Sequence, residues 1–299
     1  ARAAIRRMYE RVTKEFPRMF VTNETETLFP LGHDVSKIVD NARVRRKPFR
    51  VDLLLASPPC QSFSRANKRA KGMADDRELF TPVADIVRFL LANTSPHMKW
   101  CVENVCFGEE KRDEAPYPQL RKAREQVDAL FTSLPGTRIV KYDMCRFVSQ
   151  TRERTFWTNI PEAHEVKLPM EGAAGTYAEM LERMGKGRPY REEHKYAATN
   201  MAWDRSRVHK EGLNDYIDKN GVRQQASQDW EVQEALSGLD QGDSDVQLKG
   251  PIPDKDRQRL LGNIWVPPCM AHWIQSAWSR KAIITGIQDC LLIQTSPGI

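Results

Sequence analysis

The sequence predicts an α/β protein with a doubly wound, mixed sheet. The apolar run at 51–56 fits a strand that is buried on both faces, as in parallel sheets covered by helices. Helical and strand patterns alternate up to about residue 160, which favours a sheet wound on both sides. The chain has 299 residues, 40% hydrophobic and 29% charged, so it can bury a large core.

The elements follow in the order that such a fold requires. Apolar residues at helical spacing predict a helix over 1–15, stopped by Pro17. The elements expected after it are strands at 19–22, 51–56, 100–102, 138–142 and 155–160, with helices at 79–90 and 120–130. Glu24, Cys60 and Glu103 each follow a predicted strand. Since doubly wound sheets bind ligands beyond the carboxyl ends of their strands, we expect these side chains at one crevice.

The pattern weakens between 162 and 250, where only 230–239 predicts a helix. Within this region, residues 183–210 carry eight Lys or Arg against three Asp or Glu. Regular helix is expected again over 254–279, and no element is expected in 280–299. The sequence therefore divides into a core at 1–161, an irregular region at 162–250, a helix at 251–279 that completes the core, and a tail.

Composition narrows the class of protein. The net charge of +6 permits a polyanionic partner without requiring one. No apolar run approaches the roughly 20 residues of a membrane helix, so no membrane partner is expected. The six cysteines are sparse and lack the spacing of zinc ligands, so we expect a reducing compartment and no metal.

Three short stretches carry candidate chemistry. Cys60 follows two prolines at a strand end, a good place for a nucleophilic thiolate, although a lone cysteine also serves as a small core residue. Glu103 follows a buried strand and is a catalytic acid, an acid at a helix N-terminus or an ion-pair partner. Arg152 and Arg154 alternate, so both could reach one site or form a solvated strand edge.

These stretches together resemble the catalytic motifs of the cytosine-5 DNA methyltransferases, and look closest to the animal de novo branch. The motifs occur in the usual order: Pro58-Pro59-Cys60-Gln61, Glu103-Asn104-Val105, Gln150-x-Arg152-x-Arg154 and Arg259-Leu260-Leu261-Gly262-Asn263. The resemblance implies a Rossmann-like fold that uses S-adenosylmethionine, with 162–250 as the target-recognition region. It also implies double-stranded DNA as the partner, and the nucleus as the location in a eukaryote or the cytoplasm otherwise.

The resemblance also assigns roles to residues. Cys60 would add to C6 of a cytosine flipped out of the duplex, Glu103 would hold the ring, and Arg152 and Arg154 would orient them. The residues implied for the cofactor are Glu24, Asp34, Val35, Ser57, Pro58, Asn263 and Trp265. Those implied for nucleic acid are Ser64, Arg65, Lys68, Arg69, Asn104, Arg188, Arg205 and Arg207.

One motif of the family is missing. Its first strand and glycine-rich turn precede the helix that residues 1–15 resemble, and this chain shows neither. We therefore expect a fragment, or a subunit complemented by an N-terminal segment, or an inactive nucleic-acid-binding protein; a homo-oligomer is also compatible with the family. The tRNA-methylating branch shares the Pro-Pro-Cys-Gln loop, but its Cys-Phe-Thr signature does not occur between 162 and 250.

Overall fold

The computed structural model describes most of the chain from residue 51 onward. The described residues are Val39, 51–63, 70–75, 78–108, 118–161, 168–198, 213–242, Ser244, Arg257, Leu261, 265–277 and 290–294. The helix predicted at 1–15 and the strand predicted at 19–22 lie outside them. The chain forms two compact units. The sheet unit comprises Phe16–Lys141, Arg154–Glu165 and Gln275–Ile299, and the second unit comprises Ala1–Glu15, Tyr142–Glu153 and Val166–Ile274.

A five-stranded sheet has the strand order β3-β4-β2-β1-β8. Its strands are β1 (Leu53–Ser57), β2 (Lys99–Val105), β3 (Arg138–Asp143), β4 (Glu153–Thr158) and β8 (Cys290–Gln294). Strand β1 runs parallel to both β2 and β8, whereas β2 and β4 are antiparallel. The predicted class, an α/β fold with a mixed sheet, is confirmed.

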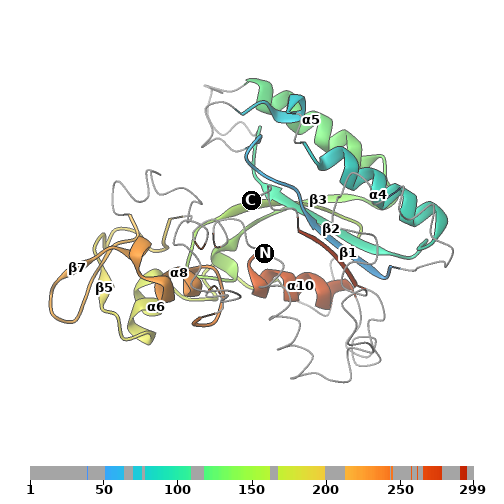
Figure 1. Cartoon of the computed structure of the whole chain (residues 1–299). Coiled ribbons are helices and arrows are strands. Elements are labelled where there is room, and N and C mark those ends of the chain that lie inside the picture. The colour runs from blue at the N-terminus through green and yellow to red at the C-terminus, as the bar shows by residue number, and fades with distance from the viewer. Residues whose placement is uncertain are drawn as a thin grey trace, which may run out of the picture. The chain divides into compact units, whose positions relative to one another are not determined.

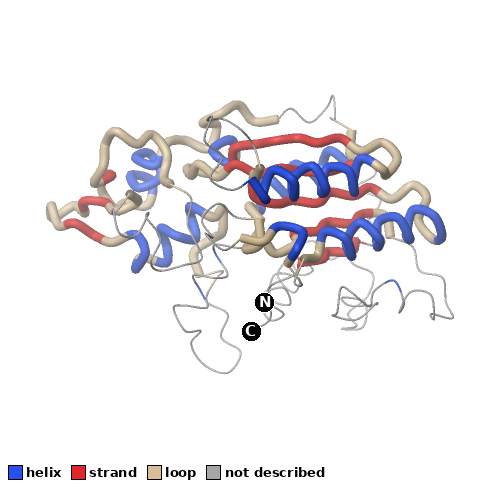
Figure 2. The backbone as a smooth tube through the Cα atoms, turned by 90° about the horizontal axis from the view of Figure 1, so that it is seen from above, coloured by secondary structure: helices blue, strands red, loops and turns tan. Residues whose placement is uncertain are grey.

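Two helices cover one face of this sheet, α4 (Phe80–Asn93) and α5 (Pro118–Thr132). They lie on the same side of the strands and run alongside them (Figures 1 and 2). The buried residues of α4 recur at helical spacing, and they pack with alternate residues of β1 and β2. That cluster includes Leu54, Ala56, Trp100 and Val102, so the residues between them lie on the opposite face.

Strand β8 corrects the prediction that 280–299 holds no element. It pairs with β1 in a continuous register from Leu53↔Cys290 to Ser57↔Gln294. A five-residue apolar strand has no periodicity of its own to separate it from a loop, and tertiary pairing with β1 decides its conformation. One edge of β1 is therefore paired with β2 and the other with β8.

The second unit contains more regular structure than predicted. It holds the helices α6 (Tyr177–Arg183), α8 (Trp230–Leu236) and α10 (Pro267–Ala277), with an antiparallel sheet of β5 (Arg188–Pro189), β6 (Tyr216–Ile217) and β7 (Arg223–Gln224). The helix predicted at 230–239 is confirmed over Trp230–Leu236 and ends three residues earlier than predicted. The prediction of an otherwise irregular region is wrong, because α6, β6 and α8 share a small apolar core. The 3₁₀ helices of the chain's described part are Gly72–Ala74, Met144–Arg146 and Ala226–Gln228.

Capping chemistry explains where two of these helices begin. Thr176 and Glu179 form a reciprocal capping box at the start of α6, which satisfies backbone N–H groups that the helix leaves open. The helix predicted over 254–279 is not continuous: Arg257 and Leu261 are helical, Trp265 and Val266 are not, and α10 starts at Pro267. Proline is favoured in a first helical turn because its missing N–H is not needed there.

Among the described residues, no helix combines the length and apolar character needed to cross a membrane.

Candidate active site

The loop after β1 carries Cys60 and is fixed to the core of the sheet unit. The carbonyl of Cys60 accepts a hydrogen bond of 3.0 Å from the backbone N–H of Phe63, which closes a tight turn. The Phe63 ring is buried, 4.8 Å from the Phe80 ring centre and 4.9 Å from that of Phe107. Cys60 itself is half-buried. A rigid turn thus holds a partly accessible thiol beyond the carboxyl end of β1.

Glu103 lies inside β2, and the prediction that it follows the strand is wrong. The parallel pairing of β1 with β2 ends at Ala56↔Val102, one residue before Glu103. On its other side β2 continues, because β4 pairs with it through Glu103↔Phe156 as far as Val105. Alternation along β2 puts Glu103 on the face opposite α4 and α5, while its position remains at the end of β1.

Both carboxylate oxygens of Glu103 have partners. The Ser57 hydroxyl donates a hydrogen bond of 2.7 Å to Oε2, and Arg154 Nε lies 2.6 Å from Oε1. The side chains of Arg154 and Glu103 are only 9% and 10% exposed. In such surroundings a charge-assisted bond is short and directional. The carboxylate is therefore held in one orientation by residues of β1 and β4.

Asn104 fixes the loop backbone. Its side-chain amide donates to the carbonyl of Pro58 at 2.9 Å, and its Oδ1 accepts from the backbone N–H of Val105 at 2.9 Å. Asn104 is 1% exposed, so these bonds form in a dry environment where each unmade one would be costly. The residue that the resemblance gives to nucleic acid thus holds the first proline of the Cys60 loop, and its contact with nucleic acid stays a prediction.

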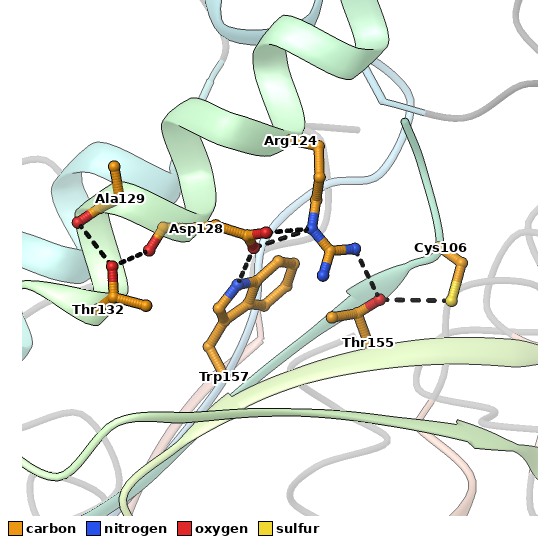
Figure 3. A network of polar contacts seen from close by, with 7 residues as sticks. All are labelled: Cys106, Arg124, Asp128, Ala129, Thr132, Thr155 and Trp157. Carbon is orange, nitrogen blue, oxygen red and sulfur yellow. Dashed lines mark hydrogen bonds and ion pairs between the residues drawn. The ribbon is translucent and has the colours of Figure 1, made fainter. Parts of the chain in front are cut away.

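A buried network secures β4 next to Arg154. Arg124 Nε lies 2.8 Å from each carboxylate oxygen of Asp128, and its Nη1 donates to Thr155 Oγ1 at 3.2 Å (Figure 3). Asp128 also accepts from Trp157 Nε1 at 2.7 Å, and Thr155 Oγ1 lies 3.3 Å from the sulfur of Cys106. The network ties α5 to β4 and to the end of β2. Sequence reasoning did not identify it, although the Arg–Asp spacing of four on a helix is a recognisable signal.

Three predicted site residues belong to the second unit. The backbone N–H of Arg152 donates to Asp143 Oδ1 at 2.8 Å, and Arg152 is 4% exposed just before β4 begins. Trp265 is buried two residues before α10 begins. Arg188 lies on β5 with an exposed side chain that pairs with Glu192. Their proposed contacts with ligand stay predictions.

The remaining predicted site residues lie outside the part of the chain that the structure describes. For the cofactor these are Glu24, Asp34, Val35 and Asn263. For nucleic acid they are Ser64, Arg65, Lys68, Arg69, Arg205 and Arg207. Of the predicted cofactor residues, Ser57 and Pro58 lie at the carboxyl end of β1, where α/β sheets bind their ligands.

Three solved structures are similar to this chain at low sequence identity. The Entamoeba histolytica methyltransferase EhMeth is 13% identical, with 89% of this chain and 84% of that chain covered and a TM-score of 0.48. The S. pombe Dnmt2 methyltransferase is 15% identical, with 75% and 76% covered and a TM-score of 0.41. A putative DNA modification methyltransferase encoded within an E. coli prophage is 14% identical, with 84% and 87% covered and a TM-score of 0.42.

Family membership rests on a different comparison, because these structural likenesses are weak. A comparison with curated proteins gave no match. The model of the family described as C-5 cytosine-specific DNA methylase matches residues 26–249. This match spans well over half of the chain and includes β1, the Cys60 loop, Glu103 and Arg154. The chain therefore belongs to the C-5 cytosine-specific DNA methylase family.

Proposed function

We propose that this chain transfers a methyl group to C5 of cytosine in double-stranded DNA through a covalent adduct with Cys60. The observation that supports it most is the buried Glu103 carboxylate, bound at 2.7 Å by Ser57 and at 2.6 Å by Arg154 beside the Cys60 loop. A carboxylate held this way has a fixed direction, which catalysis at a ring nitrogen requires.

Each residue has a defined task in the reaction. The Cys60 thiolate forms a bond to C6 of the cytosine, and the ring electrons move towards N3. Glu103 supplies a proton to N3 as charge develops there, and one of its oxygens accepts a hydrogen bond from the exocyclic amine. N3 gives this proton back when the bond between Cys60 and C6 breaks. Arg154 and Ser57 keep the carboxylate in place. After C5 gains the methyl group, a base removes the C5 proton and the bond between Cys60 and C6 breaks, which restores the aromatic ring and the thiolate.

The methyl donor of this family is S-adenosylmethionine, which supplies an electrophilic methyl group to C5. Ser57 and Pro58 fit a role at its pocket, because they end β1 at the carboxyl edge of the parallel strands. The resemblance also assigns Trp265 to the methyl donor. Glu24, Asp34, Val35 and Asn263 complete the set that the resemblance assigns.

The target base must leave the DNA helix to reach a thiol beyond the strand ends, so the proposal includes base flipping. The exposed Arg188 in the second unit suits contact with phosphates, as do the basic residues 65–69 and 205–207 of the sequence. Double-stranded DNA is favoured over tRNA by the family model and by the missing Cys-Phe-Thr signature. A nuclear location in a eukaryotic cell would follow.

Labelled S-adenosylmethionine, offered with either duplex DNA or tRNA, tests the proposal. We expect label in DNA with the unmodified protein, none with Cys60→Ser, and unchanged activity with Cys145→Ser, which alters a buried cysteine of the second unit. DNA binding by Cys60→Ser should stay within about threefold of wild type, because only the covalent step needs sulfur. Label in tRNA alone would contradict the choice of substrate, and turnover by Cys60→Ser would contradict the nucleophile.

A further inference from the structure

The ion pair of Arg124 and Asp128 lies between α5 and β4 and takes no direct part in the proposed reaction. Arg124 is 8% exposed, and its guanidinium carbon lies 5.2 Å from the centre of the Trp157 ring. A buried ion pair is a poor source of stability, because taking two charges out of water costs about as much as their attraction returns. Apolar side chains of similar volume often stabilise such a contact equally well. This pair therefore points to a role other than stability.

The pair binds β4 at two points (Figure 3). Arg124 Nη1 donates to Thr155 Oγ1 at 3.2 Å, and Asp128 accepts from Trp157 Nε1 at 2.7 Å. Thr155 and Trp157 share one face of β4, because side chains two residues apart on a strand point the same way. A slip of β4 by one residue would turn both side chains to the other face and break both bonds. The pair thus fixes the position of β4 along its own axis.

The opposite face of β4 carries the cation of the candidate active site. Arg154 directly precedes Thr155, so its side chain points away from α5. There its Nε lies 2.6 Å from Oε1 of Glu103, with the two side chains 9% and 10% exposed. The register pairs Arg154 with Val105 and Thr155 with Asn104. A displacement of Thr155 along the strand would therefore move Arg154 by a similar distance relative to Glu103.

We propose that Arg124 and Asp128 are positioning residues for the activation of cytosine, which act through Thr155 and Arg154 on the direction of the Glu103 carboxylate. This inference rests on the proposed function. Catalysis depends steeply on such positions, since a remote substitution that misplaces a group by about 1 Å can lower the rate about 100-fold. The ion pair on one side of β4 would thus set the geometry of the reaction on the other side.

Substitutions at two threonines of β4 separate positioning from stability. Thr155→Val removes the hydroxyl that Arg124 binds and keeps the branched shape of the side chain, whereas Thr155→Ser keeps the hydroxyl. Thr158→Val is the matched control. Thr158 is also fully buried in β4, and its hydroxyl donates to the carbonyl of Trp100 at 2.6 Å. The control should therefore lower the stability of the sheet unit to a similar degree while leaving the bonds of Arg124 in place.

Steady-state methylation of duplex DNA gives the first readout. Thr155→Val should lower kcat at least about tenfold and leave KM for DNA and for the methyl donor within about threefold, because the lost hydroxyl lies on the face of β4 turned away from Glu103. Thr155→Ser and Thr158→Val should keep kcat within about threefold. Added to Arg154→Lys, Thr155→Val should cost little further, because both changes affect one contact. Equal losses in Thr155→Val and Thr158→Val, or losses that multiply in the double variant, would overturn the inference.

An NMR signal tests the positioning without catalysis. The Nε–H of Arg154, assigned by its absence in Arg154→Lys, should exchange with solvent at least about tenfold faster in Thr155→Val than in the unmodified protein or Thr158→Val. Unchanged exchange in Thr155→Val refutes the inference and leaves the proposed function intact wherever DNA is methylated. If the unmodified protein methylates no DNA while the exchange changes as expected, the proposed function fails, and with it the catalytic role of the pair, whereas the link from α5 to Arg154 stands.

Discussion

The buried ion pair between Arg154 and Glu103 gives a quantitative prediction. The two atoms lie 2.6 Å apart, and the side chains are 9% and 10% exposed. Arg154→Met removes the cation and leaves a carboxylate in a site that water barely reaches. Losing one partner of a buried pair costs about 3 to 5 kcal/mol, so we expect the free energy of unfolding to fall by about 3 kcal/mol. Ser57 keeps its hydrogen bond, which places the expected cost at the lower end of the range.

The double variant Arg154→Met, Glu103→Gln separates two costs: the lost attraction between the two side chains, and the burial of one charge without its partner. Each single change should cost about 3 kcal/mol, whereas the double variant should cost less than either, about 1 kcal/mol, since no unpaired buried charge remains. Arg88→Met is the matched control, because Arg88 also lies 2.6 Å from its partner, Asp85, but the side chains are 49% and 55% exposed. Losing that exposed pair should lower the free energy of unfolding by at most about 1 kcal/mol.

Urea denaturation measures these energies, with fluorescence of the fully buried Trp100 and Trp157 as the signal for the sheet unit. The reasoning fails if Arg154→Met costs no more than Arg88→Met. It also fails if the two single costs add in the double variant to within about 0.5 kcal/mol, because additivity means that the residues do not interact.

Two further predictions concern local conformation and pH. Gly108 has φ +66°, and a Cβ added there would lie 2.5 Å from the carbonyl oxygen of Leu120. Gly108→Ala should therefore lower the free energy of unfolding by at least about 2 kcal/mol, measured by urea denaturation. A loss below about 0.5 kcal/mol would contradict this geometry. Burial alone would raise the pKa of the Glu234 carboxyl, but hydrogen bonds from Ser244 and Arg257 bring that pKa below its ordinary value of 4.5. The stabilisation from this charge is present above pH 4.5 and is lost as pH falls through the lowered pKa. In thermal melts, Glu234→Gln should therefore be less stable than wild type at pH 7 and closer to it in acid. A difference in melting temperature that stays constant across pH would show that the Glu234 charge is not its cause.

The elements that could be predicted were those with a complete local signal. The apolar run of β1 and the helical spacing in α4 and α5 appear in the sequence without knowledge of their partners. Strand β8 and the two-residue strands β5 to β7 lack such a signal, because strands this short depend on pairing with distant residues. Tertiary pairing also explains Glu103. The apolar run ends at Val102, but pairing with β4 extends β2 as far as Val105.

The candidate site was predictable in part. Cys60, Glu103 and Arg154 followed from motif order, and the contact between Glu103 and Arg154 is present in the structure. The hydrogen bond from Ser57 to Glu103 spans 46 residues, and that from Asn104 to Pro58 also spans 46, so no local pattern encodes either. These two hydrogen bonds can form only when the folded sheet brings the strand ends together.

The central claim is that Cys60 forms a covalent bond to the target cytosine, and a trapping experiment tests it most directly. Duplex DNA with 5-fluorocytosine carries no C5 proton to remove, so the enzyme should stall after methyl transfer with its sulfur still bound to C6. With S-adenosylmethionine present, we predict a protein–DNA complex that survives denaturing electrophoresis, maps to the peptide containing Cys60, and is absent for Cys60→Ser. A protein that binds both donor and duplex yet gives no such complex would contradict the account.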